Sequence, residues 1–203
     1  MKLKKEFNLY SNVMLERDKK QLLKTVSFKF SIYITNLLMN LGYNKRVFKK
    51  DQNKIINIGS GNLSFENVSN TDLFPSIGQI LKRQIKRNSN SANKYYLNLI
   101  KKEKVFENQW EGIILSHVIE HIPVYLVNDC LKNMRSYLKK GGTIRILVPD
   151  SKKYFGNLNE GLESSQGFIN SQLSLNRLFY SWEHKFMYSD KILIEILESN
   201  GFN

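Results

Sequence analysis

The pattern of apolar positions divides the chain into a helical beginning and a longer part in which strands and helices alternate. Apolar residues recur at helical spacing over 15–26 and 34–41, and Gly42 follows the second stretch where a helix-ending residue is expected. We therefore expect residues 1–50 to form a helical extension that packs on the main domain, residues 51–203.

Short apolar runs in the main domain predict strands. Ile55–Ile58 is a β-branched run that stops at Gly59, which is typical of a buried parallel strand. Weaker runs at 68–72 and 95–100 predict two more strands.

A strand–helix–strand unit is the best-defined part of the sequence. Residues 112–115 and 143–148 are apolar runs, and the pattern between them predicts a helix over 123–140 that Gly141 and Gly142 end. Such a unit predicts a right-handed crossover between parallel strands, and so an α/β fold. The apolar stripe of this helix consists of Val127, Cys130, Leu131, Met134 and Leu138.

The remainder is predicted to be less regular. Residues 151–185 are polar with scattered glycines, so we expect a long irregular loop there. A last helix is predicted from its cap at Ser189 to Gly201, close to the final residue, Asn203.

The composition is that of a globular domain with excess positive charge. The apolar fraction is 41%, the charged fraction is 24%, and 31 Lys and Arg against 18 Asp and Glu give a net charge of +13. This charge favours an anionic partner such as nucleic acid, a phospholipid surface or a phosphorylated substrate. The alternative is a compositional bias, because the basic residues are scattered and the chain is rich in Lys, Asn and Ile. A peripheral membrane contact and the oligomeric state are left open.

Cysteine usage indicates a reducing compartment. Cys130 is the single cysteine, which excludes an internal disulfide and a cysteine metal cluster, and we predict no metal site. Residues 1–10 lack the apolar run of a signal peptide, and residues 28–41 are too short and too polar to span a bilayer. We therefore expect a cytoplasmic protein with a buried, unreactive Cys130.

A glycine-containing turn is the first candidate for chemistry. Gly59 and Gly61 follow a predicted strand, and glycine there lets a ligand approach the backbone closely. Asp72 ends the next predicted strand, where an acid accepts hydrogen bonds from ribose; capping a helix or turn is the alternative role. A dinucleotide site fits poorly, because Ser64 replaces the third glycine and Asp72 comes well before the ~20-residue spacing.

A second candidate follows the strand 112–115. Residues just past such a strand face the ligand crevice of an open α/β sheet. His117 and His121 are candidate general bases, with a purely structural histidine as the alternative in each case. Glu120 is expected either to orient a histidine or to cap the following helix. His184 is expected either to help close the cleft or to be a structural histidine that hydrogen-bonds within its own loop.

Four segments carry a resemblance to a known family: N-I-G-S-G at 57–61, N-T-D-L at 70–73, W-E-G-I-I-L-S-H-V-I-E-H-I at 110–122 and L-K-K-G-G-T-I-R-I-L-V-P-D at 138–150. Together they resemble class I S-adenosylmethionine (SAM)-dependent methyltransferases, above all the bacterial group encoded with cell-surface glycan and secondary-metabolite genes. The resemblance implies a Rossmann-like three-layer αβα sandwich with a mostly parallel sheet. Because the sequence stops at Asn203, the family's final antiparallel hairpin is expected to be missing.

The resemblance also implies roles for individual residues. The glycine turn would hold the amino-acid part of SAM, Asp72 the ribose and Leu73 the adenine, with Asn98 near the adenine amino group and Ser116 beside the methionine part. The implied cofactor-binding residues are Asn57, Gly59, Ser60, Gly61, Asp72, Leu73, Asn98 and Ser116.

The expected activity is methyl transfer from SAM to an oxygen or nitrogen of a small molecule or glycan. In such a fold the variable parts choose the acceptor, here residues 1–50 and 151–185. Two alternatives stay open: an RNA methyltransferase, favoured by the net charge of +13, and a non-catalytic SAM-binding or partner-binding relic, favoured by the missing hairpin.

Overall fold

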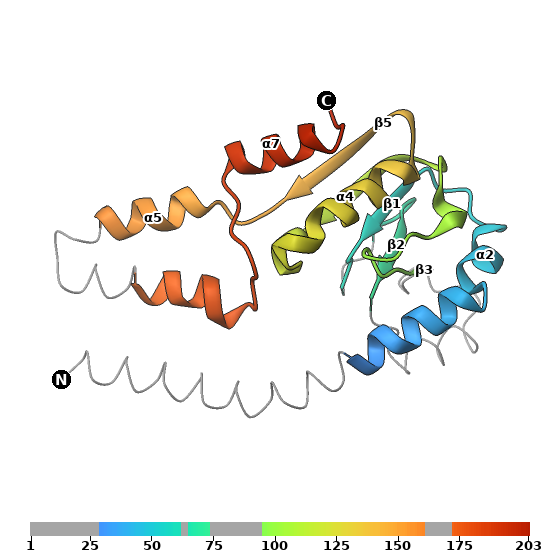
Figure 1. The fold of residues 1–203 in the computed structure, drawn as a ribbon, viewed down its shortest axis with the longest axis horizontal. Helices are drawn as coiled ribbons and strands as arrows, with labels where there is room; N and C mark the ends of the chain where they lie inside the picture. The colour runs from blue at the N-terminus through green and yellow to red at the C-terminus, as the bar shows by residue number, and fades with distance from the viewer. Residues whose placement is uncertain (1–28, 62–64, 74–94, 161–171) are drawn as a thin grey trace.

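Five parallel strands form one sheet in the order β3-β2-β1-β4-β5 (Figure 1). The computed structural model describes residues 29–61, 65–73, 95–160 and 172–203, and the helix predicted at 15–26 lies outside them. The order, in which the chain leaves β1 first to one side and then to the other, is that of a Rossmann-like α/β fold. The strands are β1 (Ile55–Ile58), β2 (Ser69–Asp72), β3 (Tyr95–Tyr96), β4 (Trp110–Ser116) and β5 (Leu138–Leu147).

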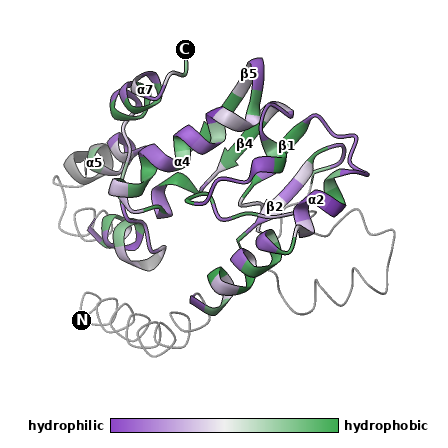
Figure 2. Ribbon diagram, turned by 45° about the vertical axis from the view of Figure 1, so that its right-hand side comes forward, coloured by the Kyte–Doolittle hydropathy of each residue, from purple (hydrophilic) through white to green (hydrophobic). Residues whose placement is uncertain are grey.

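One face of the sheet packs against helix α4 (Val124–Tyr137). The register pairs Ile56 with Ile113 and Ile58 with Leu115, so that four apolar side chains form one face across the two central strands. Figure 2 shows the hydrophobic colouring of β4 beside α4. The predicted stripe of α4 is confirmed, because Val127, Cys130, Leu131 and Met134 are all buried in the same core.

The boundary between α4 and β5 differs from the prediction. The helix ends at Tyr137, and Leu138 already pairs with Trp110 as the first residue of β5. Pairing resumes between Thr143 and Gly112, so residues 139–142 form an irregularity within the strand and are not the last helical turn. Pairing with a distant strand therefore outweighs the local helix-ending pattern.

The N-terminal helices pack against the β3 edge of the sheet. A helix over 29–40 ends at Gly42, whose left-handed φ of 70° confirms its predicted position, and α2 (Tyr43–Phe48) follows. The amide of Asn44 donates to the carbonyl of Tyr96 over 2.9 Å. Phe48 joins a cluster of rings at the base of the sheet, formed with Tyr95, Phe106, Trp110 and Tyr137.

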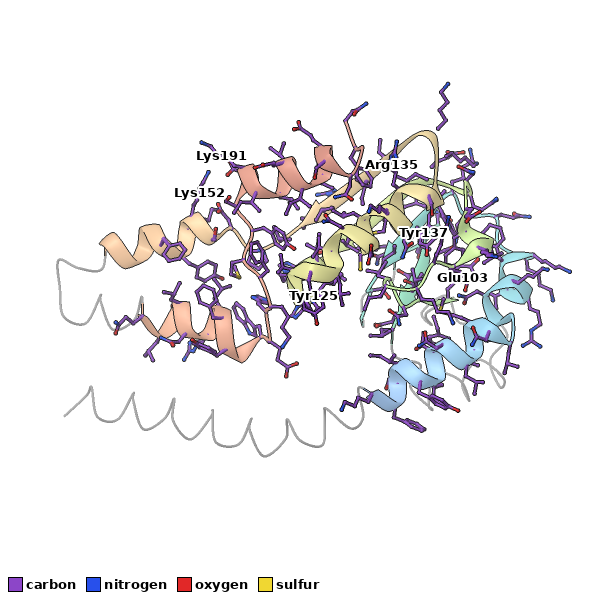
Figure 3. The ribbon with its side chains drawn as sticks, viewed as in Figure 1. Glu103, Tyr125, Arg135, Tyr137, Lys152 and Lys191 are labelled. Carbon is purple, nitrogen blue, oxygen red and sulfur yellow. The ribbon has the colours of Figure 1, made fainter. Side chains whose placement is uncertain are left out.

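A short turn beside β3 is fixed to the end of α4. The turn η1 (Lys104–Phe106) carries Phe106 into the ring cluster. At its start the backbone N–H of Glu103 donates to the Tyr137 hydroxyl over 2.8 Å, and Figure 3 labels both residues.

The prediction of an irregular loop over 151–185 is wrong for the described residues 151–160 and 172–181, which are helical. Helix α5 (Ser151–Glu160) begins there because Asp150 caps it, with Oδ1 accepting the Lys152 N–H over 2.9 Å. A further helix over 172–176 runs into the wider turn η4 (Arg177–Ser181).

The last helix, α7 (Asp190–Ser199), is confirmed. The Ser189 hydroxyl accepts the N–H of Ile192 over 3.3 Å, as expected of the N-cap, and Gly201 follows the helix with a φ of 80°. Among the described residues, no helix is both long enough and apolar enough to cross a bilayer.

The opposite face of the sheet is more exposed than the face under α4. Ile55 of β1 and Leu147 of β5 are each 38% exposed, and Arg145 is exposed between them. Only residues 59–68 connect β1 to β2, which is less chain than a crossover with a helix requires. The short connection leaves room for a pocket on this face.

Candidate functional site

The glycine turn after β1 adopts a backbone conformation that disfavours other residues. Gly59 has a φ of 70° and Gly61 a φ of 54°, both in the left-handed region. A Cβ added at Gly59 would lie 2.4 Å from Cγ2 of Val118. The turn is thus packed directly on the segment that follows β4.

The turn is also bonded to the end of β2. The Ser60 N–H donates to the Thr71 carbonyl over 2.9 Å, and the Gly61 N–H donates to Oδ2 of Asp72 over 3.0 Å. The other carboxylate oxygen, Oδ1, accepts the Leu73 N–H over 2.6 Å. The structure therefore brings Gly61 and Asp72 together at one sheet edge, while their roles toward a ligand stay a prediction.

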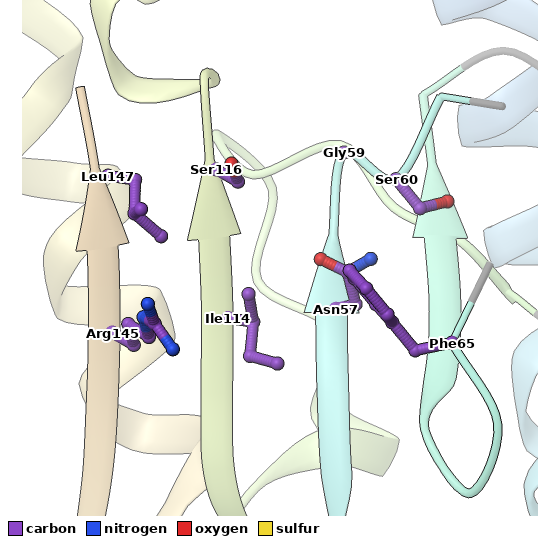
Figure 4. Close-up of a pocket in the computed structure, with 8 residues that line it drawn as sticks. All are labelled: Asn57, Gly59, Ser60, Phe65, Ile114, Ser116, Arg145 and Leu147. Carbon is purple, nitrogen blue, oxygen red and sulfur yellow. The ribbon is translucent and has the colours of Figure 1, made fainter. Parts of the chain in front are cut away.

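A pocket of about 320 Å³ extends from the glycine turn down the exposed face of the sheet (Figure 4). Its floor is a row across three strands, because Asn57 pairs with Ile114 and Ile114 pairs with Arg145. The volume lies at the lower end of the range for small-molecule sites, ~300–1,000 Å³. The pocket is completed by Gly59, Ser60, Phe65, Ser116 and Leu147.

Four of the predicted cofactor-binding residues, Asn57, Gly59, Ser60 and Ser116, line this pocket. Asn57 is buried, and its side-chain N–H donates to Oδ1 of Asn70 over 3.1 Å, which fixes its orientation.

Two other predicted residues contact the helix over 29–40. The Leu73 carbonyl accepts the Thr35 hydroxyl, and Nδ2 of Asn98 donates to Oδ1 of Asn36 over 3.4 Å. The four predicted cofactor-binding residues that do not line the pocket are Gly61, Asp72, Leu73 and Asn98.

Half of the pocket lining was not predicted from the sequence: Phe65, Ile114, Arg145 and Leu147. The signal for the strand residues was their alternation, since Ile114 shares a face with Ser116, and Arg145 shares a face with Leu147. Arg145 is in addition a charged residue within an apolar strand, a pattern that indicates a side chain outside the packed core.

Glu120 orients a histidine, the first of the two roles left open for it. It lies in the short turn η2 (Ile119–His121), and its buried Oε1 is 3.2 Å from Nδ1 of His117. Helix α4 receives no side-chain cap at its N-cap, Pro123. His117 has a left-handed φ of 53° and a largely exposed ring.

His184 lies beside His121, although the two residues are far apart in the sequence. Their ring centroids are 4.8 Å apart. The carbonyl of Glu120 accepts the N–H groups of Lys185, over 2.7 Å, and of Phe186, over 3.2 Å, which fixes the two segments together. Burial lowers the pKa of His184, and the neighbouring His121 and His117 lower it further.

Comparisons with known proteins give likeness of fold only. No family model and no curated protein matches the chain. A SAM-dependent methyltransferase from Archaeoglobus fulgidus is 17% identical with a TM-score of 0.43, over 83% of this chain and 69% of that one. The trans-methyltransferase CalH, solved with SAH, is 18% identical with a TM-score of 0.46, over 78% and 47%.

A third structure, phosphoethanolamine N-methyltransferase 2 of Haemonchus contortus with SAM, is 14% identical with a TM-score of 0.43, over 79% of this chain and 36% of that one. This chain thus spans about a third to two thirds of the three proteins. At such identities and TM-scores the likenesses carry no argument about activity. The strand order itself establishes the Rossmann-like α/β fold, which is structurally similar to these methyltransferases.

Proposed function

We propose that the chain is a SAM-dependent methyltransferase that transfers a methyl group to an oxygen or nitrogen of a small molecule or glycan, as in the bacterial glycan and secondary-metabolite group. The observation that carries this proposal is the 3.0 Å hydrogen bond from the Gly61 N–H to the Asp72 carboxylate. It joins the glycine turn to an acid at the carboxyl edge of a parallel sheet, where nucleotide-type ligands bind.

The residues present fit such a cofactor. An added Cβ at Gly61 would meet nothing within 4 Å, so this side of its backbone is open to close approach, and Gly59 and Ser60 line the pocket. The Asp72 carboxylate would accept ribose hydroxyls with the capacity that its two backbone bonds leave. Ser116 would lie beside the methionine part. When bound, SAM supplies an activated methyl group, and the chain supplies alignment and exclusion of water.

His117 and His121 are the proposed general bases, which would take the proton from the hydroxyl group that is methylated. His117 follows the pocket residue Ser116, and the buried Glu120 holds its Nδ1. A carboxylate in this position fixes the orientation of the ring. This arrangement favours His117 over His121 as the base.

Calorimetry on the full chain with SAM, S-adenosylhomocysteine and NAD tests the cofactor assignment. We expect the two adenosyl ligands to bind and NAD to bind weakly or not at all. Asp72→Asn should weaken SAM binding at least tenfold, while the matched exposed variant Asp129→Asn should not. Preference for NAD, or equal binding by both variants, would contradict the proposal.

A screen with isotopically labelled SAM identifies the acceptor. Label in a small hydroxyl or amine compound, or in a glycan, is the expected result. Label in RNA would support the alternative RNA methyltransferase instead. SAM binding without label in any class would support the non-catalytic alternative.

A further inference from the structure

All three histidines of the chain gather around one carboxylate. The sequence contains only His117, His121 and His184, and each lies close to Glu120 in space. One ligand atom each from Glu120, His121 and His184 lies within 4.8 Å of the others. The first two come from the turn after β4, and His184 comes from the segment between η4 and α7.

Two polar atoms of this cluster are buried without hydrogen-bond partners among the described residues. The Glu120 side chain is completely buried, and its Oε2 has no hydrogen-bond partner in the described part of the chain. Nδ1 of His184 is likewise buried and without one. A buried carboxylate oxygen is costly unless a proton donor or cation satisfies it. Two such atoms facing one cluster therefore indicate a missing ligand.

We propose that Glu120, His121 and His184 bind a divalent transition-metal ion of the Zn²⁺ type. Two imidazole nitrogens and one carboxylate oxygen form a ligand set that suits Zn²⁺ and its neighbours rather than Mg²⁺ or Ca²⁺. Three protein ligands leave at least one coordination position open. With His121 bound to the ion, His117 is the one of the two proposed bases that stays available. The sequence predicts no metal site, because it holds a single cysteine and no local pattern brings His184 to Glu120.

Neighbouring groups support the ligands as they do in known metal sites. His117 lies 3.2 Å from the second oxygen of Glu120, and the backbone of Leu178 hydrogen-bonds the His184 ring. Such outer contacts orient metal ligands. Metal–ligand bonds are ~2.0–2.2 Å long, so the side chains must close on the ion by about an ångström. The two backbone bonds to the Glu120 carbonyl keep both segments in register for this closure.

The open position gives the ion a further use. Ser116 lines the pocket and is followed by the turn that carries Glu120 and His121. Resting on the proposed function, we infer that the ion binds an oxygen of the methyl acceptor, which selects acceptors that carry a hydroxyl group.

Titration of the untagged full chain with Co²⁺ tests the site, because Co²⁺ replaces Zn²⁺ and gives a visible absorption band. We expect one equivalent to bind and to be displaced by Zn²⁺. His184→Ala and Glu120→Gln should each weaken binding at least tenfold, and the exposed Glu198→Gln on α7 should bind like the parent. His117 is the only other histidine in the sequence, and the single cysteine is buried.

A second measurement covers the case in which a variant fails to fold. Zn²⁺ should protect His121 and His184 of the unaltered chain from diethyl pyrocarbonate, as read by mass spectrometry. Absence of Co²⁺ binding, unchanged binding by both variants, or absence of protection would overturn the site. Calorimetry with SAM, run in parallel, separates the proposals: Co²⁺ binding without SAM binding removes the cofactor assignment alone, and SAM binding without Co²⁺ binding removes the metal site alone.

Discussion

Gly59 packs directly against Val118: a methyl group added to the glycine would lie 2.4 Å from Cγ2 of the valine. This contact joins the turn after β1 to the segment after β4, which carries His117, Glu120 and His121. The turn after β1 and the segment after β4 are therefore packed together, and a substitution at Gly59 should disturb the position of both.

Gly59→Ala should lower the free energy of unfolding by about 2–4 kcal/mol, because it adds a clash to a left-handed backbone. Gly42→Ala is the matched control, since Gly42 has the same φ of 70° but nothing within 4 Å of an added Cβ. It should cost only about 1–2 kcal/mol. Urea unfolding of both variants measures the difference.

Removal of the valine side chain should relieve the clash. In the Val118→Ala background, Gly59→Ala should cost about as much as Gly42→Ala does in the parent chain. If the double-mutant cycle shows no coupling, the two residues do not pack as described.

Arg145→Ala should weaken SAM binding about tenfold, or ~1.4 kcal/mol. Arg145 is the only charged residue among the eight that line the pocket, and SAM carries a carboxylate that a guanidinium can bind. Lys140→Ala, which removes an exposed cation of β5 away from the pocket, is the control. Calorimetry should find its affinity unchanged, and equal losses in both variants would mean that only the overall charge matters.

The meeting of Gly61 and Asp72 could be predicted because it depends on little beyond strand order. Parallel neighbouring strands place their carboxyl ends at one edge, so a residue after β1 and a residue at the end of β2 lie together. The stripe of α4 was predictable for a similar reason, since helical spacing alone defines the buried face.

The start of β5 and the histidine cluster could not be predicted from local patterns. Leu138 has the spacing of a helical residue, and only its pairing with Trp110 makes it part of a strand. His184 reaches Glu120 through backbone bonds across more than sixty positions of sequence. Such long-range contacts leave no periodic signal. The polar composition of 151–185 also gave no indication of the helices that precede His184.

Ser189→Ala should destabilise the fold by ~1 kcal/mol, because the hydroxyl caps α7 by accepting the Ile192 N–H. Ser199→Ala at the other end of the same helix is the control; its hydroxyl only donates to the Ile196 carbonyl within the last turn. Thermal unfolding should show a clearly larger shift for Ser189→Ala. Equal shifts would indicate that the cap contributes nothing.

Burial should make the Cys130 thiol unreactive and the fold sensitive to alkali. Burial raises the pKa of Cys130 from 9.0 to about 12, with a smaller contribution from Asp129, and burial likewise raises the pKa of Tyr188 to about 12. At pH 8 the thiolate fraction is then roughly a thousandfold lower in the folded chain than in the unfolded chain. A thiol-specific reagent should modify one thiol per chain rapidly in urea and only very slowly without it.

The raised pKa values of Cys130 and Tyr188 also determine how the free energy of unfolding depends on pH. Both groups bind their protons more tightly in the folded state than in the unfolded state, so their contribution is complete below pH 9 and is lost as the pH rises toward 12. The urea midpoint should therefore fall steadily above pH 9. Cys130→Ala should make the fall of the urea midpoint with pH less steep, even though it lowers stability at neutral pH by leaving a small cavity. A slope that is the same with and without the thiol would show that Cys130 ionises as freely in the folded chain as in the unfolded one.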